Sequence, residues 1–196
     1  MQRRENEKRM MIDNIQKATI DIINEEGYEQ LSIRKIATRI DYSPTNIYNY
    51  FKNKGKIIES IIVMKSKDVI AKVEKKLQAN NDKPFDIQFE IFVETFVKEM
   101  LKEPQQVQAV IQSGYNIFAN YTKDEANSGS SGLGLFMQLG IETKKIRSDI
   151  SESSVILIMT SLLGLISMIV NEDIPKQEID LLIEEEIKLL WNGVKR

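Results

Sequence analysis

Hydroxyl, amide and phenol side chains follow one another at short intervals between Gly27 and Lys54. Groups of this kind recognise DNA: asparagine pairs with the edge of adenine, a threonine methyl contacts a thymine methyl, and hydroxyls and helix N-termini bind phosphate. The stretch therefore suggests a polar helix placed against a DNA groove. The candidate contact residues are Ser32, Arg34, Ser43, Thr45, Asn46, Tyr48, Asn49, Tyr50 and Lys54.

Two short helices joined by a tight turn would position these groups. Ser32 can cap a first helix that runs through Ile40, while Ser43 and Pro44 supply the cap and first-turn proline of a second helix. Only two residues separate the helices, and Asp41 tolerates the left-handed backbone that such a turn can require. The pattern predicts a helix-turn-helix.

Each of these helices has an apolar face that would turn inward. The first repeats apolar residues at i, i+3, i+4 and i+7, which is one face of a helix, and the second has a single stripe at i, i+4. A small alanine suits the point where the helices cross. The apolar positions are Ile33, Ile36, Ala37 and Ile40, then Ile47 and Phe51.

The polar face of the second helix is the candidate for reading bases. Thr45, Asn46 and Asn49 can reach base edges, and the absence of arginine within that helix predicts a preference for A/T-rich half-sites. The free amides beside Ser32 can bind a phosphate, although Ser32 can equally serve only as a cap. Arg34 can contact phosphate or a base, or remain a solvated arginine.

Residues 12–58 resemble the helix-turn-helix of the TetR family of bacterial transcriptional regulators. The resemblance rests on a Gly-Tyr pair after the first helix, a Ser before the second, an Ile-Ala pair within it, and the run Ile-Tyr-x-Tyr-Phe-x-x-Lys. Three positions depart from the commonest pattern: Leu31 stands where Thr is frequent, Asp41 where Gly is frequent, and Gly55 where an acidic residue often follows the lysine. Gly55 could loosen the helix that begins there.

The resemblance implies roles for further residues and for the whole chain. Tyr48 and Tyr50 correspond to phosphate-contacting aromatics and Lys54 to a phosphate-binding lysine, although Tyr48 could be packing and Lys54 an ordinary surface lysine. The implied fold is all-α, with about nine helices: an N-terminal three-helix DNA-binding domain and a C-terminal domain for ligand binding and dimerisation. The implied partners are a pseudo-palindromic double-stranded DNA operator, a small hydrophobic effector and a second copy of the chain.

Composition limits the chemistry of the chain. Cysteine and histidine are both absent, which excludes Ser-His-Asp and Cys-His catalysis and the usual zinc sites. A carboxylate-only magnesium site stays possible in principle, but no acidic pair or phosphate-binding glycine loop supports one. We therefore expect no enzyme activity, no metal and no cofactor. The charged start has no apolar region like that of a signal peptide, so we expect a cytoplasmic protein.

Charge is divided unevenly along the chain. Residues 1–56 carry eleven Lys and Arg against eight Asp and Glu, whereas residues 57–196 carry sixteen against twenty-one. A basic N-terminal part attached to an acidic body fits a DNA surface at one end. We predict a DNA-binding domain over residues 1–53 and an effector-binding and dimerisation domain over residues 54–196.

A run of sixteen uncharged residues, 155–170, could belong to a membrane or to a subunit interface. A bilayer span needs about 20 apolar residues, and this run is shorter and contains Thr, Ser and Gly. We expect no membrane span, and instead a helix buried on one face by its own core and on another by a partner. The predicted interface residues are Ile158, Leu162, Leu165, Ile169, Ile183, Ile187, Leu190 and Trp191.

Aromatic residues recur at steps of four, three and four along the helix expected between Pro84 and Pro104. Such a ridge most often belongs to a core, and the same residues can line an apolar pocket for an aromatic or acyl-chain-like effector. The candidate pocket residues are Phe89, Phe92, Phe96, Tyr115, Phe118, Phe136, Met137 and Met159. Residues 128–132 could be an entrance loop or an ordinary connector.

Three functions remain open at this point. The first is a ligand-responsive repressor released from its operator by the effector. The second is a DNA-binding protein without a small-molecule effector, which acts through protein partners in a structural or cell-division role. The third, an enzyme built on a helical bundle, is disfavoured by the missing His and Cys.

Overall fold

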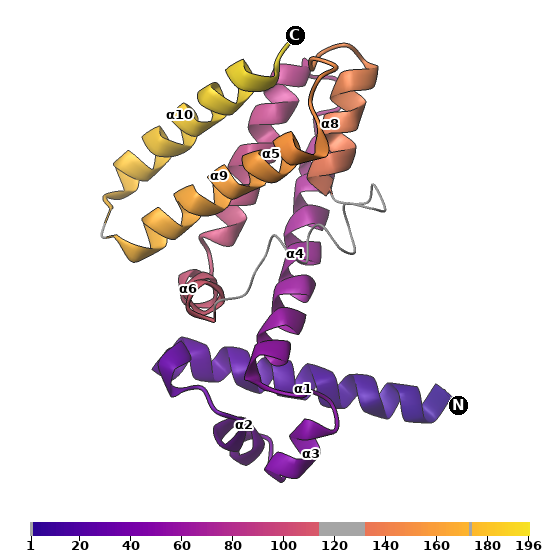
Figure 1. Ribbon diagram of the computed structural model, residues 1–196, viewed down its shortest axis with the longest axis vertical. Helices are drawn as coiled ribbons and strands as arrows, with labels where there is room; N and C mark the ends of the chain where they lie inside the picture. Colours follow the sequence, from indigo (N-terminus) through magenta and orange to yellow (C-terminus); the bar gives the residue numbers. More distant parts are fainter. Residues whose placement is uncertain (1, 114–131, 173) are drawn as a thin grey trace. The chain divides into compact units, whose positions relative to one another are not determined.

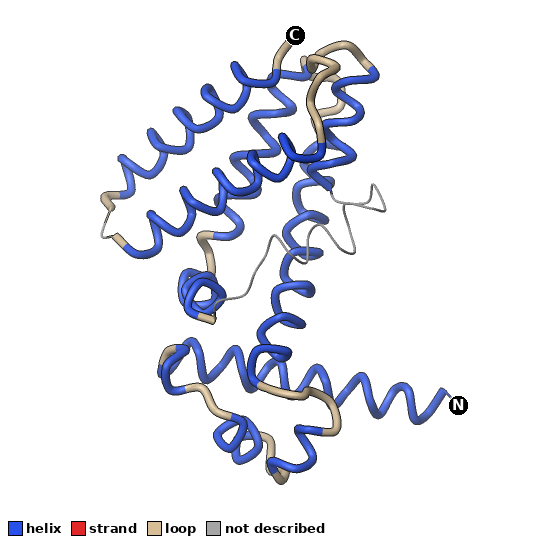
Figure 2. The backbone as a smooth tube through the Cα atoms, viewed as in Figure 1, coloured by secondary structure: helices blue, strands red, loops and turns tan. Residues whose placement is uncertain are grey.

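A computed structural model of the chain describes residues 2–113, 132–172 and 174–196. Within these residues the regular structure is helical, as Figure 2 shows, apart from one isolated antiparallel bridge between Ile146 and Lys195. The all-α prediction is therefore confirmed. The chain divides into two compact units. Among the described residues, the N-terminal unit contains 2–67 and 103–113, and the C-terminal unit contains 68–102, 132–172 and 174–196. The boundary predicted after residue 53 separates DNA binding from effector binding and dimerisation, and it stays a prediction.

The N-terminal unit is built on a long first helix, α1, that carries three short elements and the first part of α4 (Figure 1). Its core brings together apolar residues from α1, α2, α3, α4 and α6, including Ile15, Ile36, Ile47, Ile57 and Ala109. The elements are α1 (Gln2–Glu26), η1 (Tyr28–Gln30), α2 (Ile33–Arg39), α3 (Pro44–Tyr48), α4 (Lys54–Ala79) and α6 (Pro104–Gln112).

The capping predictions for the two short helices are confirmed. Ser32 Oγ accepts a hydrogen bond from the Lys35 amide at 3.2 Å, and Ser43 Oγ accepts one from the Asn46 amide at 3.3 Å. Asp41 has φ 58°, the left-handed backbone expected for the turn. These local signals fix the start of α2, the start of α3 and the turn between them.

Two features of this region differ from the expectation. The helical part of α3 ends at Tyr48, and the following residues form a turn in which the Phe51 amide donates to the Ile47 carbonyl at 3.0 Å. Phe51 nevertheless stays buried as predicted. The start of α4 also has a cap that the sequence reading missed, because Asn53 Oδ1 accepts from the Lys56 amide at 3.0 Å. This cap secures the helix beside Gly55.

The C-terminal unit packs the second part of α4 with α5 (Phe85–Met100), α8 (Gly132–Glu142), α9 (Glu152–Asn171) and α10 (Lys176–Val194). In this unit α5 lies against both α9 and α10, and α8 lies against α9. Ser151 and Ser154 form a reciprocal capping box at the start of α9. The sequence also predicts a helix over about residues 105–121; it is described as α6 only as far as Gln112, and its remainder lies outside the described residues.

Helix α9 is the one helix in the described part of the chain that is long and apolar enough, by length and composition, to cross a bilayer. Core helices of soluble proteins meet the same criterion. Only 22% of its apolar window is buried inside the chain, so α9 leaves apolar surface uncovered even though it packs on α5, α8 and α10.

The tightest packing around a glycine in the C-terminal unit is at Gly140 in α8. A Cβ there would lie 2.5 Å from Ile146 Cδ1 and 2.7 Å from Phe85 Cζ. Ile146 is fully buried and Phe85 stacks on Phe136, so neither side chain can move without disturbing its neighbours. Close approach, and not a special backbone angle, accounts for glycine at this position.

We expect Gly140→Ala to lower the free energy of unfolding by about 1–2 kcal/mol, because overpacking outweighs the gain in helix propensity. Gly193→Ala in α10 is the matched control: no atom lies within 4 Å of its added Cβ. It should leave stability unchanged or slightly raised. Thermal unfolding followed by circular dichroism measures both, and equal midpoints for the two variants would contradict the packing argument.

Candidate nucleic-acid interface

Helix α3 presents most of its polar candidates to solvent. Thr45 and Asn49 are exposed, Tyr48 is 55% exposed, and Asn46 is half-buried. Ile47 on the opposite side is buried in the core, so it anchors the helix and fixes which face points outward. The predicted packing role for Tyr48 finds no support in this exposure. Because the exposed side chains of this helix do not pack in the core, they are available to contact base edges.

Tyr50 is placed differently from Tyr48. It is half-buried, and its ring packs against the N-terminal core. A tyrosine in this position contributes an apolar ring to the fold and can still offer its hydroxyl to a phosphate. The family resemblance gives Tyr48 and Tyr50 the same role, but in the structure Tyr48 is exposed and Tyr50 packs against the core.

Arg34 differs from the other two cations of α2. Lys35 Nζ lies 2.5 Å from Glu26 Oε2, and Arg39 Nη2 lies 2.6 Å from Glu25 Oε2, so both cations are held by the end of α1. The hydrogen bond from Arg39 also lowers the pKa of Glu25, which keeps that carboxyl ionised. Arg34 is exposed and has no ion pair within the described part of the chain. It is the α2 cation that remains available for DNA.

Lys54 is positioned by an aromatic ring. Its Nζ lies 4.0 Å from the centroid of the Tyr28 ring, a cation–π contact that fixes a flexible side chain without neutralising its charge. The interpretation of Lys54 as an ordinary surface lysine is weaker as a result. In the sequence Tyr28 stands out only as the second member of the Gly-Tyr pair after the first helix, and nothing in the spacing of residues 28 and 54 predicts that they meet.

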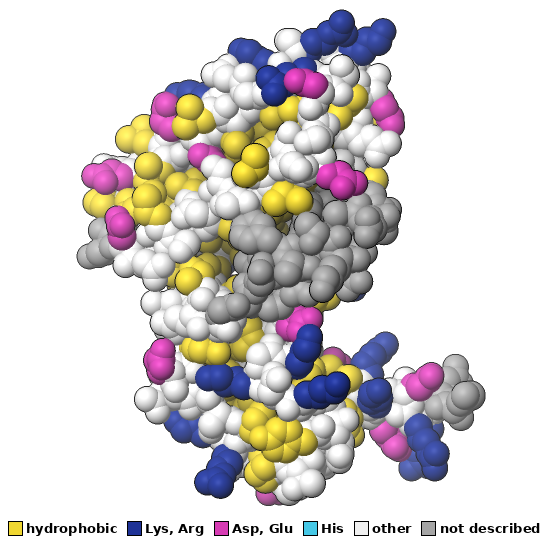
Figure 3. Space-filling view, in the orientation of Figure 1, with side chains coloured by type: hydrophobic (Ala, Val, Ile, Leu, Met, Phe, Trp, Pro, Cys, Tyr) yellow, Lys and Arg dark blue, Asp and Glu magenta, His cyan; other side chains and the backbone are white. Residues whose placement is uncertain are grey.

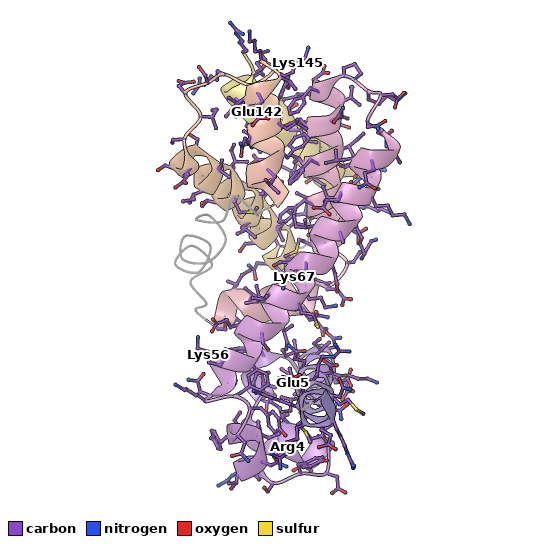
Figure 4. The ribbon with its side chains drawn as sticks, turned by 90° about the vertical axis from the view of Figure 1, so that its right-hand side faces the viewer. Arg4, Glu5, Lys56, Lys67, Glu142 and Lys145 are labelled. Atoms are coloured by element: carbon purple, nitrogen blue, oxygen red, sulfur yellow. The ribbon has the colours of Figure 1, made fainter. Side chains whose placement is uncertain are left out.

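Two further exposed residues border this surface and were missed. Tyr42, in the turn between α2 and α3, is 46% exposed, and Lys52 is exposed just before α4. Lys56, labelled in Figure 4 near the start of α4, forms an ion pair with Glu59. Figure 3 shows Lys and Arg side chains around an apolar area on this unit. The combination of cations, phenols and amides is suited to binding a polyanion.

Residues 15–61, which contain this surface, match the family model described as "Bacterial regulatory proteins, tetR family". This segment is therefore similar to the DNA-binding domain of the TetR family. The match covers the N-terminal part alone and supports DNA binding and transcription regulation by this protein.

Solved structures extend the fold comparison to nearly the whole chain. A TetR-family transcriptional regulator from Haemophilus influenzae is 20% identical with a TM-score of 0.67, covering 96% of this chain and 98% of its own. The fatty acid degradation regulator FadR from Bacillus halodurans is 21% identical with a TM-score of 0.68, covering 93% and 95%. At this identity the likeness concerns the fold. No protein with a curated function matches the sequence.

The predicted pocket residues of the C-terminal unit form an aromatic cluster. Phe136 stacks on Phe85 and Phe92 at centroid distances of 4.8 and 5.1 Å, and Phe89 lies 5.3 Å from Trp191. Phe96 and Met137 are also buried, and Met159 is half-buried. Tyr115, Phe118 and the predicted entrance loop, except Gly132, lie outside the described residues. The cluster is a core; whether it also lines a pocket stays a prediction.

The predicted interface residues fall on two faces of α9 and α10. Four are buried within the chain itself: Ile158, Leu162, Ile169 and Ile183. The other four are half-buried: Leu165, Ile187, Leu190 and Trp191. The leucines that these helices leave exposed are Leu157 at 67%, Leu181 at 59% and Leu189 at 68%. The part that these residues play in an interface stays a prediction.

We expect Asn49→Ala and Lys54→Gln to weaken operator binding in different ways. Asn49→Ala should cost about 1–3 kcal/mol on a selected site and relax base preference, because it removes a possible base contact. Lys54→Gln should weaken binding to all sequences and reduce the slope of log K against log salt by about 1, as expected for a lost phosphate contact.

Lys67→Gln is the matched control for the lysine. Lys67 is exposed further along α4, as Figure 4 shows, and has no ion pair among the described residues. Fluorescence anisotropy over a salt series compares the variants. A salt slope that changes equally for Lys54→Gln and Lys67→Gln would contradict a positioned phosphate contact at Lys54.

Proposed function

We propose that this protein is a TetR-family repressor that binds a pseudo-palindromic operator as a homodimer in the cytoplasm and leaves it when a small hydrophobic ligand binds. The observation that carries the DNA part is the exposed polar face of α3, which is backed by Ile47 in the core and flanked by the unpaired Arg34 and the ring-held Lys54. Such a surface separates base-reading groups from phosphate-binding groups.

A homodimer is supported by the uncovered apolar surface on α9 and α10. Single exposed leucines are common on protein surfaces, but Leu157, Leu181 and Leu189 accompany a helix with most of its apolar window unburied. Packing two such helix pairs together gives a four-helix arrangement. The helix-turn-helix domains of the two subunits, here called the two heads, would then contact successive major grooves about 34 Å apart.

The effector part of the proposal is supported by the aromatic cluster. Phe92, Phe136 and their neighbours offer polarisable, apolar surface that suits an aromatic or acyl-chain ligand. The similar Bacillus halodurans protein is described as a regulator of fatty acid degradation, so fatty acids are the first ligands to test. Release from DNA would follow from a change in the separation of the two heads that costs a few kcal/mol of binding.

The alternative without an effector keeps the same DNA surface and assigns regulation to protein partners. It gains support if no ligand displaces the chain from its operator. An enzyme remains the weakest reading, since the chain has neither His nor Cys and the described residues contain no group of acidic side chains that could hold a metal.

We expect a joint Leu181→Lys and Leu189→Lys variant to be monomeric, because each leucine buried at an interface contributes about 1.5–3 kcal/mol. Leu135→Lys on α8, a leucine of comparable exposure, is the matched control and should stay dimeric. Sedimentation velocity measures the mass. A wild-type chain that sediments as a monomer, or is recovered with membranes, would contradict the dimer.

Trp191 provides an internal reporter for the effector, because it is the chain's one tryptophan and lies against Phe85 and Phe89. We expect dodecanoate to change its emission saturably and to release the operator at the same concentrations. Trp191→Phe should lose the signal and keep the release. Operator affinity that is unchanged at saturating dodecanoate would reject this ligand.

A further inference from the structure

The first turns of α1 extend beyond the core of the N-terminal unit. Residues 3–10, here called the α1 arm, are all exposed, and packing against the core begins at Met11 and Ile12. Eight helical residues span about 12 Å. No residue of the arm belongs to the core, so packing against the core does not account for its charged side chains.

The arm carries a net charge of +2. It carries four cations, Arg3, Arg4, Lys8 and Arg9, against Glu5 and Glu7. Cations near a helix N-terminus oppose the helix dipole, and the like charges of Arg4 and Lys8, four residues apart, repel each other. Arg3 pairs with Glu7 at 3.0 Å, whereas the other three cations have no ion pair in the described ranges.

The two mutually repelling cations lie on the side of α1 that faces the helix-turn-helix. Arg4 and Lys8 continue the line of Met11, Ile15 and Ile22, at helical steps of four, three, four and seven. Since Ile15 and Ile22 point into the core shared with α2 and α3, the arm's cations project on that same side of α1. Figure 4 shows Arg4 on this side and Glu5 away from it.

We propose that the α1 arm is an additional DNA contact, in which Arg4 and Lys8 bind backbone phosphates outside the stretch of major groove read by α3. Charge complementarity and continuity with the family's DNA-binding domain support duplex DNA as the occupant. A polyanion relieves both the repulsion between these side chains and their conflict with the helix dipole. The contact is independent of base sequence.

This inference rests on the proposed DNA-binding function, and salt dependence can test it separately. The probe is a duplex selected by the wild-type chain from a random library, made in two lengths, with flanks beyond the site and trimmed to the site. The test variant is Arg4→Gln with Lys8→Gln. The matched control is Lys75→Gln with Lys76→Gln, which removes the same charge from exposed positions of α4 in the C-terminal unit.

With the flanked duplex, the arm variant should have a salt slope smaller than wild type by about 1.8 for each bound head. Between 50 and 200 mM salt, the wild-type head should therefore lose roughly twelvefold more affinity than the variant head. The control pair should match wild type. Trimming the flanks should weaken wild type and leave the arm variant unchanged, and the preference for selected over random duplex should stay the same in both.

The possible failures are distinguishable. If wild type binds the flanked duplex but the arm variant has the slope of the control, the arm proposal is overturned and the proposed function stands. If wild type binds no duplex, both are overturned. Thermal unfolding shows whether weaker DNA binding by the arm variant comes from unfolding. Its thermal midpoint should equal or exceed that of wild type, because the substitutions remove like-charge repulsion.

Discussion

The DNA surface depends on burial of a few apolar side chains beneath two helices that are too short to form alone. Helix α2 has seven residues and α3 has five, whereas isolated helices shorter than about 12–15 residues are marginal in water. Their order comes from Ile36, Ala37 and Ile47, which reach the core formed with α1 and α4. Every outward-facing polar group on α3 owes its direction to this inward contact.

The features predicted correctly from sequence are those that depend on neighbours along the chain. Caps at Ser32 and Ser43 and the left-handed Asp41 follow from local backbone chemistry. The family signature is also local, because it is a string of residues in one short segment. Local rules were sufficient for most of the helical architecture.

Features formed between distant residues could not be predicted in the same way. Lys54 at the start of α4 and Tyr28 in η1 meet only in the folded unit, and no periodicity encodes that contact. On α9 and α10 the sequence contains more apolar residues than one face requires, so it indicates burial without indicating which face packs internally. Ile158 and Leu162 proved internal, while Leu157 and Leu189 stayed exposed. Deciding between faces requires the tertiary arrangement.

The division of labour on α3 has an evolutionary consequence. Thr45, Tyr48 and Asn49 are exposed and lie outside the core, whereas Ile47 between them is buried in it. Substitutions at the three exposed positions should therefore cost little in folding, since surface changes usually alter stability by less than about 0.5 kcal/mol. If these residues contact base edges, as proposed, such substitutions would change which operator is bound. A duplicated gene can diverge toward new target promoters through α3 while its scaffold remains constant.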